Sequence, residues 1–202
     1  MKHANFLHLL LVALLLVVAV PVRAQGGPQA QLKETVDAVL AVLRDGALDS
    51  AAKRERISPL VRARFDFPTM AQWVLGPQWR QASAAEQERF VGLFSDLLEA
   101  TYIGRIDEYS GEQVVFIGEQ IEDRRAQVDT KVMTRSAEIP INYRLVSRGE
   151  QWLVFDVIIE NVSLVRNYRS SFSEIVRREG MQSLFAQMEK RISELKAGGG
   201  AG

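Results

Sequence analysis

The sequence predicts an α+β fold in which a curved antiparallel sheet of about four strands is wrapped by N-terminal and C-terminal helices. Apolar residues recur every three or four positions before Gly111, alternate with polar residues over the next stretch, and later return to helical spacing. The strand-like segments follow one another through short connections, which favours antiparallel pairing over β-α-β crossovers. The segment Trp152–Ile159 is apolar except at Asp156. We therefore expect this strand to have apolar cover on both faces, with sheet and helices enclosing a large apolar interior.

Residues 1–24 have the features of a secretory signal peptide. Lys2 supplies a positive charge, Phe6–Val20 is an apolar run, and Val22-Arg23-Ala24 places small residues at the cleavage positions. Cleavage after Ala24 would leave 178 of the 202 residues, a length typical of one domain. We predict a signal peptide at 1–24, a single domain at 25–195 and a flexible glycine-rich tail at 196–202.

Three helices are expected in the first part of the domain. The first carries an apolar stripe and ends at Gly46. Asp49 is placed to cap a second helix, which Pro59 is expected to split. Asp66 and Gly76 mark the start and the end of a short third helix.

The longest helix is expected from about Ala84 to Tyr109. Ser83 and Glu86 match the capping box Ser-x-x-Glu just before and inside its first turn. Its apolar stripe is broad and bulky, which suits a core helix and would equally serve as one wall of a lipid pocket.

Four strands and two closing helices complete the domain. Arg148-Gly149-Glu150 is expected to form a hairpin turn, and Glu122-Asp123-Arg124-Arg125 a solvated hairpin rather than a docking patch. Ser163 stands at the N-cap position of the first closing helix, and Gly180 separates it from the second. The expected strands are 113–119, 124–134, 138–147 and 152–159, and the expected helices are 163–178 and 181–195.

The composition excludes several classes of enzyme. The chain has no cysteine, and its two histidines, His3 and His8, lie inside the predicted signal peptide. The predicted mature protein therefore lacks the imidazole and the thiol that hydrolytic triads and most zinc sites use. No calcium-loop spacing and no glycine-rich phosphate loop occurs in the sequence. We expect no catalytic residues, no metal and no cofactor.

The charge balance points away from nucleic acid. Without Lys2 and Arg23, 23 basic residues face 25 acidic ones, a net charge of about −2. A chain this balanced is not suited to neutralising phosphates along a nucleic acid. It also has no basic run that would hold it on an anionic membrane.

Three polar residues stand out near the apolar segments. Asp156 is the only charge in its strand and either serves a catalytic role or, on the plainer interpretation, pairs with an arginine or accepts backbone amides. Asn167 and Arg169 flank Tyr168 and lie off the apolar stripe of their helix. They are placed either at a pocket mouth, contacting a polar headgroup, or in helix capping and surface salt bridges.

Two stretches carry a family resemblance. Residues 65–80, Phe-Asp-Phe-Pro-Thr-Met-Ala-Gln-Trp-Val-Leu-Gly-Pro-Gln-Trp-Arg, resemble a signature segment of the MlaC, or toluene-tolerance, family of periplasmic phospholipid-binding proteins. Residues 155–172, Phe-Asp-Val-Ile-Ile-Glu-Asn-Val-Ser-Leu-Val-Arg-Asn-Tyr-Arg-Ser-Ser-Phe, resemble the second. Asn161 stands where many members have glycine, and asparagine also tolerates a left-handed turn.

The resemblance implies a fold and a function. The implied fold is a cone of the NTF2-like or cystatin-like kind with a helical annex and an apolar cavity between sheet and helices. The implied function is that of a soluble periplasmic phospholipid carrier that maintains outer-membrane lipid asymmetry. Its implied partners are phospholipid, an outer-membrane lipoprotein–porin complex, and an inner-membrane ABC transporter with a lipid-binding ring protein. We expect a monomer.

A lipid carrier needs an extended apolar wall. A diacyl lipid has about thirty methylenes, and at roughly 0.8 kcal/mol each their exposure to water costs more than 20 kcal/mol. We expect this wall on the inward faces of the sheet and helices, although core packing is an equally good explanation of any single position. The predicted lipid-binding residues are Met70, Val74, Phe94, Leu97, Leu98, Tyr102, Val128, Val132, Ile141, Tyr143, Phe155, Val157, Leu164, Tyr168 and Phe172.

Two alternatives stay open at the level of sequence. One is a periplasmic interaction or chaperone module with a packed core and an exposed apolar groove. The other is an enzyme on the same fold that uses Asp156 together with Tyr143. Phospholipid that copurifies with the protein would separate the carrier from both.

Overall fold

The computed structural model describes residues 26–198, so the predicted signal peptide lies outside the described residues. The sheet is antiparallel with the strand order β1-β2-β3-β4-β5, which confirms the predicted α+β class. In chain order the elements are α1 (Pro28–Arg44), α2 (Ser50–Arg64), α3 (Phe67–Leu75), the 3₁₀ helix η1 (Gly76–Arg80), α4 (Ala84–Tyr102), the 3₁₀ helix η2 (Ile103–Glu108), β1 (Gln113–Glu122), β2 (Arg125–Met133), β3 (Glu138–Arg148), β4 (Gln151–Ile159), β5 (Val162–Ser163), α5 (Leu164–Glu179) and α6 (Met181–Gly198).

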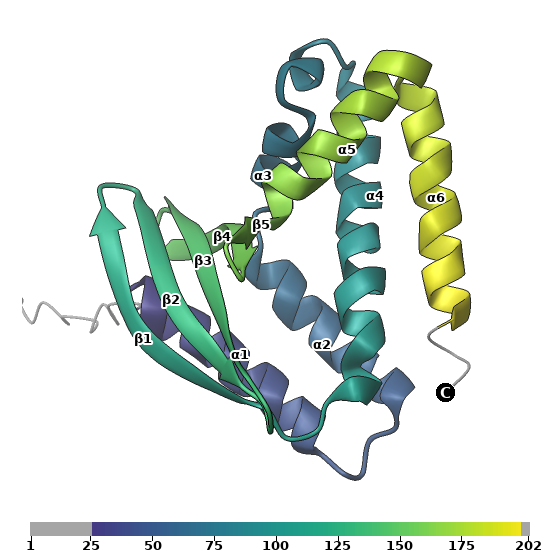
Figure 1. Ribbon diagram of the computed structural model, residues 1–202. Coiled ribbons are helices and arrows are strands. Elements are labelled where there is room, and N and C mark those ends of the chain that lie inside the picture. The colour runs from purple at the N-terminus through teal and green to yellow at the C-terminus, as the bar shows by residue number, and fades with distance from the viewer. Residues whose placement is uncertain (1–25, 199–202) are drawn as a thin grey trace, which may run out of the picture.

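The helices form two groups on either side of β4. The sheet is strongly curved, and α1 and α2 lie against its concave face, while α3, α4, α5 and α6 pack on one another beyond β4 (Figure 1). β5 is a two-residue strand that leads directly into α5. The four long strands match the predicted number.

The interior is divided into two apolar clusters. The helical cluster joins α3, α4, α5 and α6 and includes Phe155 from β4. The concave cluster joins α1 to the inner face of the sheet and includes Val154 and Val157, also from β4. β4 therefore has apolar cover on both faces, as its continuous apolar run predicted.

A β-bulge explains how one strand serves both clusters. Arg144 of β3 pairs with Asp156, but the next residue, Leu145, pairs with Val154, so Phe155 is the extra residue on β4. A bulge interrupts the strict alternation of side chains. As a result Val154 and Val157 point to the concave cluster, although they are three residues apart.

The predicted helix caps are confirmed. The side chains of Asp49, Asp66 and Ser163 each accept a hydrogen bond from a backbone N–H in the first turn of α2, α3 and α5 respectively. Ser83 and Glu86 form the complete capping box of α4. Each cap satisfies amides that the helix itself leaves without a partner.

Several boundaries differ from the sequence prediction; β1, for example, runs to Glu122 rather than to Glu119. Pro59 does not split α2, which runs unbroken to Arg64; the proline removes one donor, and burial of Ile57 holds the helix in place. The long helix ends at Tyr102 and tightens into η2 where the chain turns towards β1. α6 extends to Gly198, into the expected glycine-rich tail.

Phe155→Ala is predicted to lower the free energy of unfolding by about 3–5 kcal/mol, because the buried aromatic ring through which β4 packs on the helical cluster is lost. Urea denaturation followed by circular dichroism measures this loss. Ile117→Ala on β1, where the side chain is 59% exposed, is the control and should cost far less. Equal losses in the two variants would contradict the central role of Phe155.

Candidate functional site

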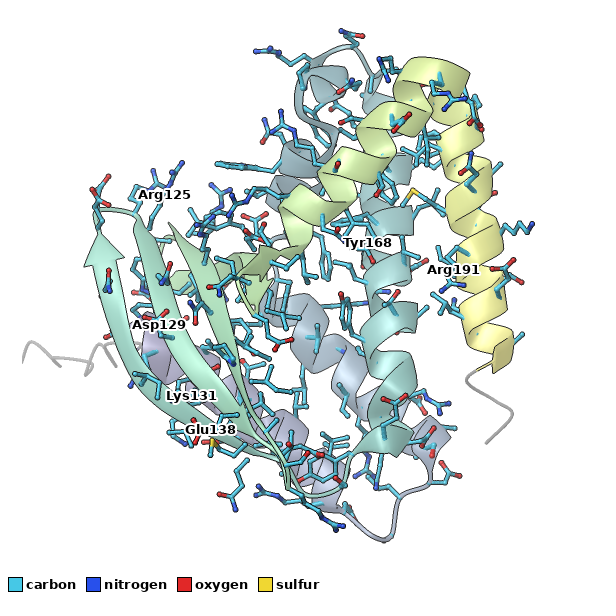
Figure 2. All side chains as sticks on the ribbon, viewed as in Figure 1. Arg125, Asp129, Lys131, Glu138, Tyr168 and Arg191 are labelled. Atoms are coloured by element: carbon cyan, nitrogen blue, oxygen red, sulfur yellow. The ribbon has the colours of Figure 1, made fainter. Side chains whose placement is uncertain are left out.

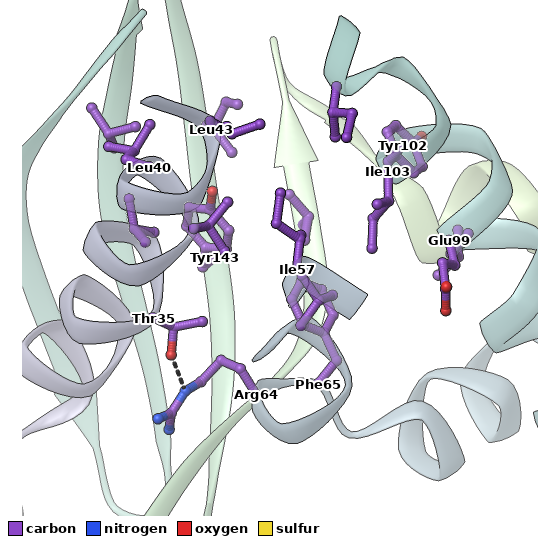
Figure 3. Close-up of a pocket in the computed structure, with 18 of the residues that line it drawn as sticks. Thr35, Leu40, Leu43, Ile57, Arg64, Phe65, Glu99, Tyr102, Ile103 and Tyr143 are labelled. Atoms are coloured by element: carbon purple, nitrogen blue, oxygen red, sulfur yellow. Dashed lines mark hydrogen bonds between the residues drawn. The ribbon is translucent and has the colours of Figure 1, made fainter. Parts of the chain in front are cut away.

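The concave side of the sheet encloses an apolar cavity of about 590 Å³. α1 and α2 form one side, and the end of α4 with η2 forms the other (Figure 3). In the close-up, Leu40 and Leu43 of α1 and Tyr143 of β3 lie across the space from Tyr102 and Ile103. The sheet supplies the floor, so the cavity lies between layers that are far apart in the sequence.

The cavity wall is mostly aliphatic and aromatic. The 3.6-residue period of α1 turns one stripe of the helix inward, and the two-residue period of the strands does the same for alternate positions. The apolar wall consists of Leu32, Val36, Val39, Leu40, Leu43, Ile57, Val61, Phe65, Phe67, Leu98, Tyr102, Ile103, Ile106, Val114, Val132, Ile141, Tyr143, Val157, Ile159 and Leu164, with Tyr109 beside them.

Gln31 fixes the start of α1 over the sheet. Its side-chain amide donates to the backbone oxygens of Gly26 and Glu150 at 2.9 and 2.8 Å. Its side-chain oxygen accepts from the backbone N–H of Trp152 at 2.9 Å and from the guanidinium of Arg64 at 2.9 Å. This buried amide has partners for both of its ends, so it orients α1 without leaving an unsatisfied polar group.

The two arginines of the cavity lining, Arg62 and Arg64, are already engaged. Arg62 donates to Ser95, Asp96 and Glu99 at 2.7–2.8 Å, and its hydrogen bond with Asp96 raises its pKa. Arg64 donates to Thr35 at 2.9 Å, and burial lowers the pKa of its guanidinium. Neither cation is free to attract an anionic group into the apolar space.

Tyr143 is the polar group nearest the middle of the cavity wall. Its ring lines the cavity (Figure 3), and no hydrogen bond joins its hydroxyl to any other residue of the described chain. Burial raises its pKa to about 12. The hydroxyl therefore keeps its proton at neutral pH and can donate a hydrogen bond to a guest molecule.

Seven of the predicted lipid-binding residues line this cavity. They are Leu98, Tyr102, Val132, Ile141, Tyr143, Val157 and Leu164. The other eight lie outside its lining, packed in or against the two clusters: Met70, Val74, Phe94, Leu97, Val128, Phe155, Tyr168 and Phe172. A helical period identifies the buried face of a helix, but it does not say which neighbour covers that face.

Tyr168 shows this difference clearly. It points from α5 towards α4 (Figure 2), and its ring packs edge-on against Phe94 at 5.3 Å between centroids. Burial raises the pKa of its hydroxyl. The ring belongs to the helical cluster rather than to the cavity.

The predicted pocket-mouth residues also lie elsewhere. Asn167 is exposed on α5, and the guanidinium of Arg169 lies against Gly76 at the end of α3. Neither residue is part of the cavity lining. The cavity geometry therefore gives no support to the expected headgroup role of these two residues.

Sequence reasoning missed the largest contribution to the wall. α1 supplies five apolar residues, and α2 with the segment that follows it supplies Ile57, Val61, Phe65 and Phe67. The amphipathic stripe of α1 in the sequence indicates that one face of this helix is buried. The sequence does not indicate that α1 folds back across the concave face of the sheet.

Asp156 has a structural role. Its carboxylate accepts from the hydroxyl of Ser163 at 2.7 Å and from the backbone N–H of Val165 at 3.2 Å, and Arg144 lies 3.6 Å away. This confirms the plainer interpretation, an arginine pair and backbone amides at the start of α5. Tyr143 pairs with Val157 and faces the concave side, whereas Asp156 faces the other, so the two do not form a joint catalytic site.

The described residues show neither a metal site nor a membrane span. Between residues 26 and 198, no group of three or more histidine, cysteine, aspartate or glutamate residues could hold a metal ion. No helix in that range is both long and apolar enough to cross a membrane.

Comparisons with known proteins agree on one family. The model of the family described as "MlaC protein" matches residues 33–190. A similar protein from Haemophilus influenzae, named intermembrane phospholipid transport system binding protein MlaC, is 21% identical over 127 residues, which are 60% of this chain and 59% of that protein. The toluene tolerance protein ttg2D of Pseudomonas putida is 26% identical over 103 residues, 50% of this chain and 48% of that protein. The matched segments thus span about half to three-fifths of these relatives.

A solved structure has the same fold. It is a phospholipid-binding protein from Ralstonia solanacearum, determined in complex with a phospholipid. It superposes with a TM-score of 0.76 at 24% identity, and the match covers 85% of this chain and 99% of that one. At this identity the likeness establishes the fold.

Asp156→Ala is predicted to lower the free energy of unfolding by about 2–4 kcal/mol, because the buried Ser163 hydroxyl and Val165 amide lose their acceptor and Arg144 its partner. Glu138→Gln, in the exposed ion pair with Lys131 (Figure 2), is the control and should change stability by less than about 1 kcal/mol. Thermal and urea unfolding of both variants measure the difference. A stability loss no larger than that of the control would overturn the structural role of Asp156.

Tyr143 is predicted to make the fold sensitive to alkali. In the unfolded chain tyrosine ionises near pH 10, whereas the buried hydroxyl holds its proton up to about pH 12. Its contribution to stability is therefore complete below pH 10 and is lost as the pH rises from 10 to 12, by up to about 3 kcal/mol. Between pH 10 and 12 the free energy of unfolding should fall less steeply with pH for Tyr143→Phe than for the unmodified protein. The same pH dependence in both proteins would mean that Tyr143 is not shielded from water.

Proposed function

The chain belongs to the MlaC protein family, and we propose that it is a periplasmic phospholipid carrier whose acyl chains occupy the cavity on the concave side of the sheet. The observation that carries the proposal is the apolar space of about 590 Å³ bounded by α1, α2, the end of α4 and the sheet. An empty space of this size does not contribute to the stability of a core, because the side chains around it lose packing contacts.

The size of the cavity bears on its cargo. At about 590 Å³ it falls within the roughly 300–1,000 Å³ of pockets that hold drug-sized ligands. A diacyl phospholipid is larger than such ligands, so holding both of its chains would require the cavity to widen.

α1 is the wall that we expect to move. Its first residues are tied to the sheet by Gln31 and by Glu119, which accepts from the backbone N–H of Gln29 at 2.7 Å. Its last turn is held by fewer polar contacts, from Lys53 to the backbone oxygen of Leu43 and from Arg44 to Tyr109. An outward swing of this last turn would enlarge the cavity beside Leu40 and Leu43.

Tyr143 supplies a hydrogen-bond donor inside an otherwise apolar wall. Ester groups of a phospholipid carry oxygen acceptors, and the Tyr143 hydroxyl is not engaged with another described residue. A hydrogen bond from this hydroxyl to an ester oxygen would fix how deeply the cargo enters. The remaining contacts are apolar and distributed, as suits a carrier that must also release its cargo.

The wider transport role rests on family membership and on the names of the relatives. We propose that the protein receives and delivers phospholipid between an outer-membrane lipoprotein–porin complex and the ring protein of an inner-membrane ABC transporter. The predicted signal peptide would bring it to the periplasm. The enzyme alternative loses its candidate pair, since Asp156 and Tyr143 face opposite sides of the sheet.

The first test is native mass spectrometry of the mature protein, purified from periplasm without detergent and followed by lipid extraction. Discrete adducts in the phospholipid mass range are expected, and their masses give the number of acyl chains. A protein that is free of lipid and takes none up from vesicles would overturn the proposed function.

Leu40→Glu is predicted to reduce lipid occupancy by about tenfold or more, because it places a carboxylate in the apolar wall. Ala41→Glu is the matched control, since the neighbouring residue is exposed and absent from the lining. Both variants should keep the circular dichroism spectrum of the unmodified protein. Equal lipid content in the two variants would place the acyl chains elsewhere.

A further inference from the structure

A second hollow lies where η1 meets α5. It measures about 280 Å³ and is lined by Gln72, Gly76, Pro77, Trp79, Arg80 and Arg169. None of these six residues lines the large cavity. The two stretches that carry the family resemblance meet here, because η1 and α5 are in contact. We call this feature the arginine hollow.

Gly76 allows the guanidinium of Arg169 to lie in the hollow. Gly76 has a φ of +56°, a conformation that side chains rarely adopt. A Cβ atom at this position would be 2.9 Å from Nη2 and 3.0 Å from Cζ of Arg169. The bare backbone of the glycine is therefore what gives the guanidinium its place.

The two arginines of the hollow have no acidic partner. Several arginines of the chain are paired, such as Arg89 with Glu189 and Arg148 with Asp66. Neither Arg80 nor Arg169 makes an ion pair or a hydrogen bond with another residue in the range 26–198. Arg169 lies near the C-terminal end of α3, where a cation is favoured by the helix dipole, but this leaves its N–H donors unused.

An anion would complete this arrangement. No acidic residue lines the hollow, so two like charges share a recess without compensation. The planar fork of an arginine matches a carboxylate through two parallel hydrogen bonds. A bound carboxylate would satisfy these donors and supply the negative charge that the hollow lacks.

We propose that the arginine hollow is a docking site for a glutamate or aspartate side chain of an acidic partner protein. Trp73 on the adjoining α3 is 42% exposed, and Arg125 from the β1–β2 hairpin lies 5.9 Å from its ring (Figure 2). Tryptophan and arginine dominate the binding energy of many protein interfaces. This inference goes beyond the cargo site and holds whichever lipid the cavity carries.

A protein partner fits the hollow better than a membrane surface does. Anionic membranes are bound by clusters of about four to eight basic residues, whereas the hollow is lined by only two, Arg80 and Arg169. The expected mature chain is also slightly acidic overall, with 25 acidic residues in the sequence. A single inserted carboxylate needs only the recess and its two cations.

The test uses the mature full-length protein and two capped peptides, one with two adjacent glutamates and one with glutamines in their place. The readouts are the NMR signals of the Gly76 amide and of the Arg80 and Arg169 side-chain Nε–H groups. The glutamate peptide should shift these signals saturably, with a dissociation constant on the order of 1 mM. The double variant Arg80→Gln/Arg169→Gln should weaken binding about tenfold or more, and added salt should weaken it as well.

Arg177→Gln is the matched control, because Arg177 is exposed on the same helix and outside the hollow. Unchanged signals with the glutamate peptide, equal binding of the glutamine peptide, or equal binding by the double variant would each overturn the proposal. So would sedimentation with phosphatidylglycerol vesicles that depends on the two arginines while the peptide leaves the signals unchanged. Native mass spectrometry of the same samples reports lipid content separately, so a failed docking site is distinguishable from a failed cargo site.

Discussion

The structure depends on β4 being covered by apolar residues on both faces. Its outward side joins the helical cluster through Phe155, and its concave side joins the sheet to α1 through Val154 and Val157. The bulge at Phe155 allows β4 to pack against both clusters, and the rest of the strand keeps its pairing with β3. Asp156, held by Ser163 and Val165, then joins the same strand to the start of α5.

This arrangement separates the densely packed helical cluster from the cavity. The helical cluster is filled by stacked and edge-on rings, such as Phe90, Phe94 and Phe172. The concave cluster is smaller and covers only part of the sheet. The cavity lies between α1 and α2 on one side and the end of α4 with η2 on the other. Under the proposed function, the cargo would lie beside the concave cluster, apart from the densely packed helical cluster.

The arginines of the cavity lining differ from those of the arginine hollow. The two arginines in the cavity lining are engaged within the chain, as Arg62 is with Asp96 and Glu99, and the rest of the wall is mostly apolar. The arginine hollow is different, because its two cations have no partner among the described residues. Cargo and partner would thus be recognised on separate surfaces by separate physical means, burial of apolar area on one and charge pairing on the other.

The sequence by itself determined the features that depend on near neighbours. Caps at Asp66 and Ser163 and the double cover of β4 follow from side chains acting within one turn or one strand. It did not determine which buried stripe lines the cavity, because periodicity marks a buried face without naming what lies opposite. Tertiary structure placed Tyr168 in the helical cluster and brought α1 across the sheet. Whether an apolar face is packed in a cluster or lines a cavity depends on which distant segment of the chain folds against it.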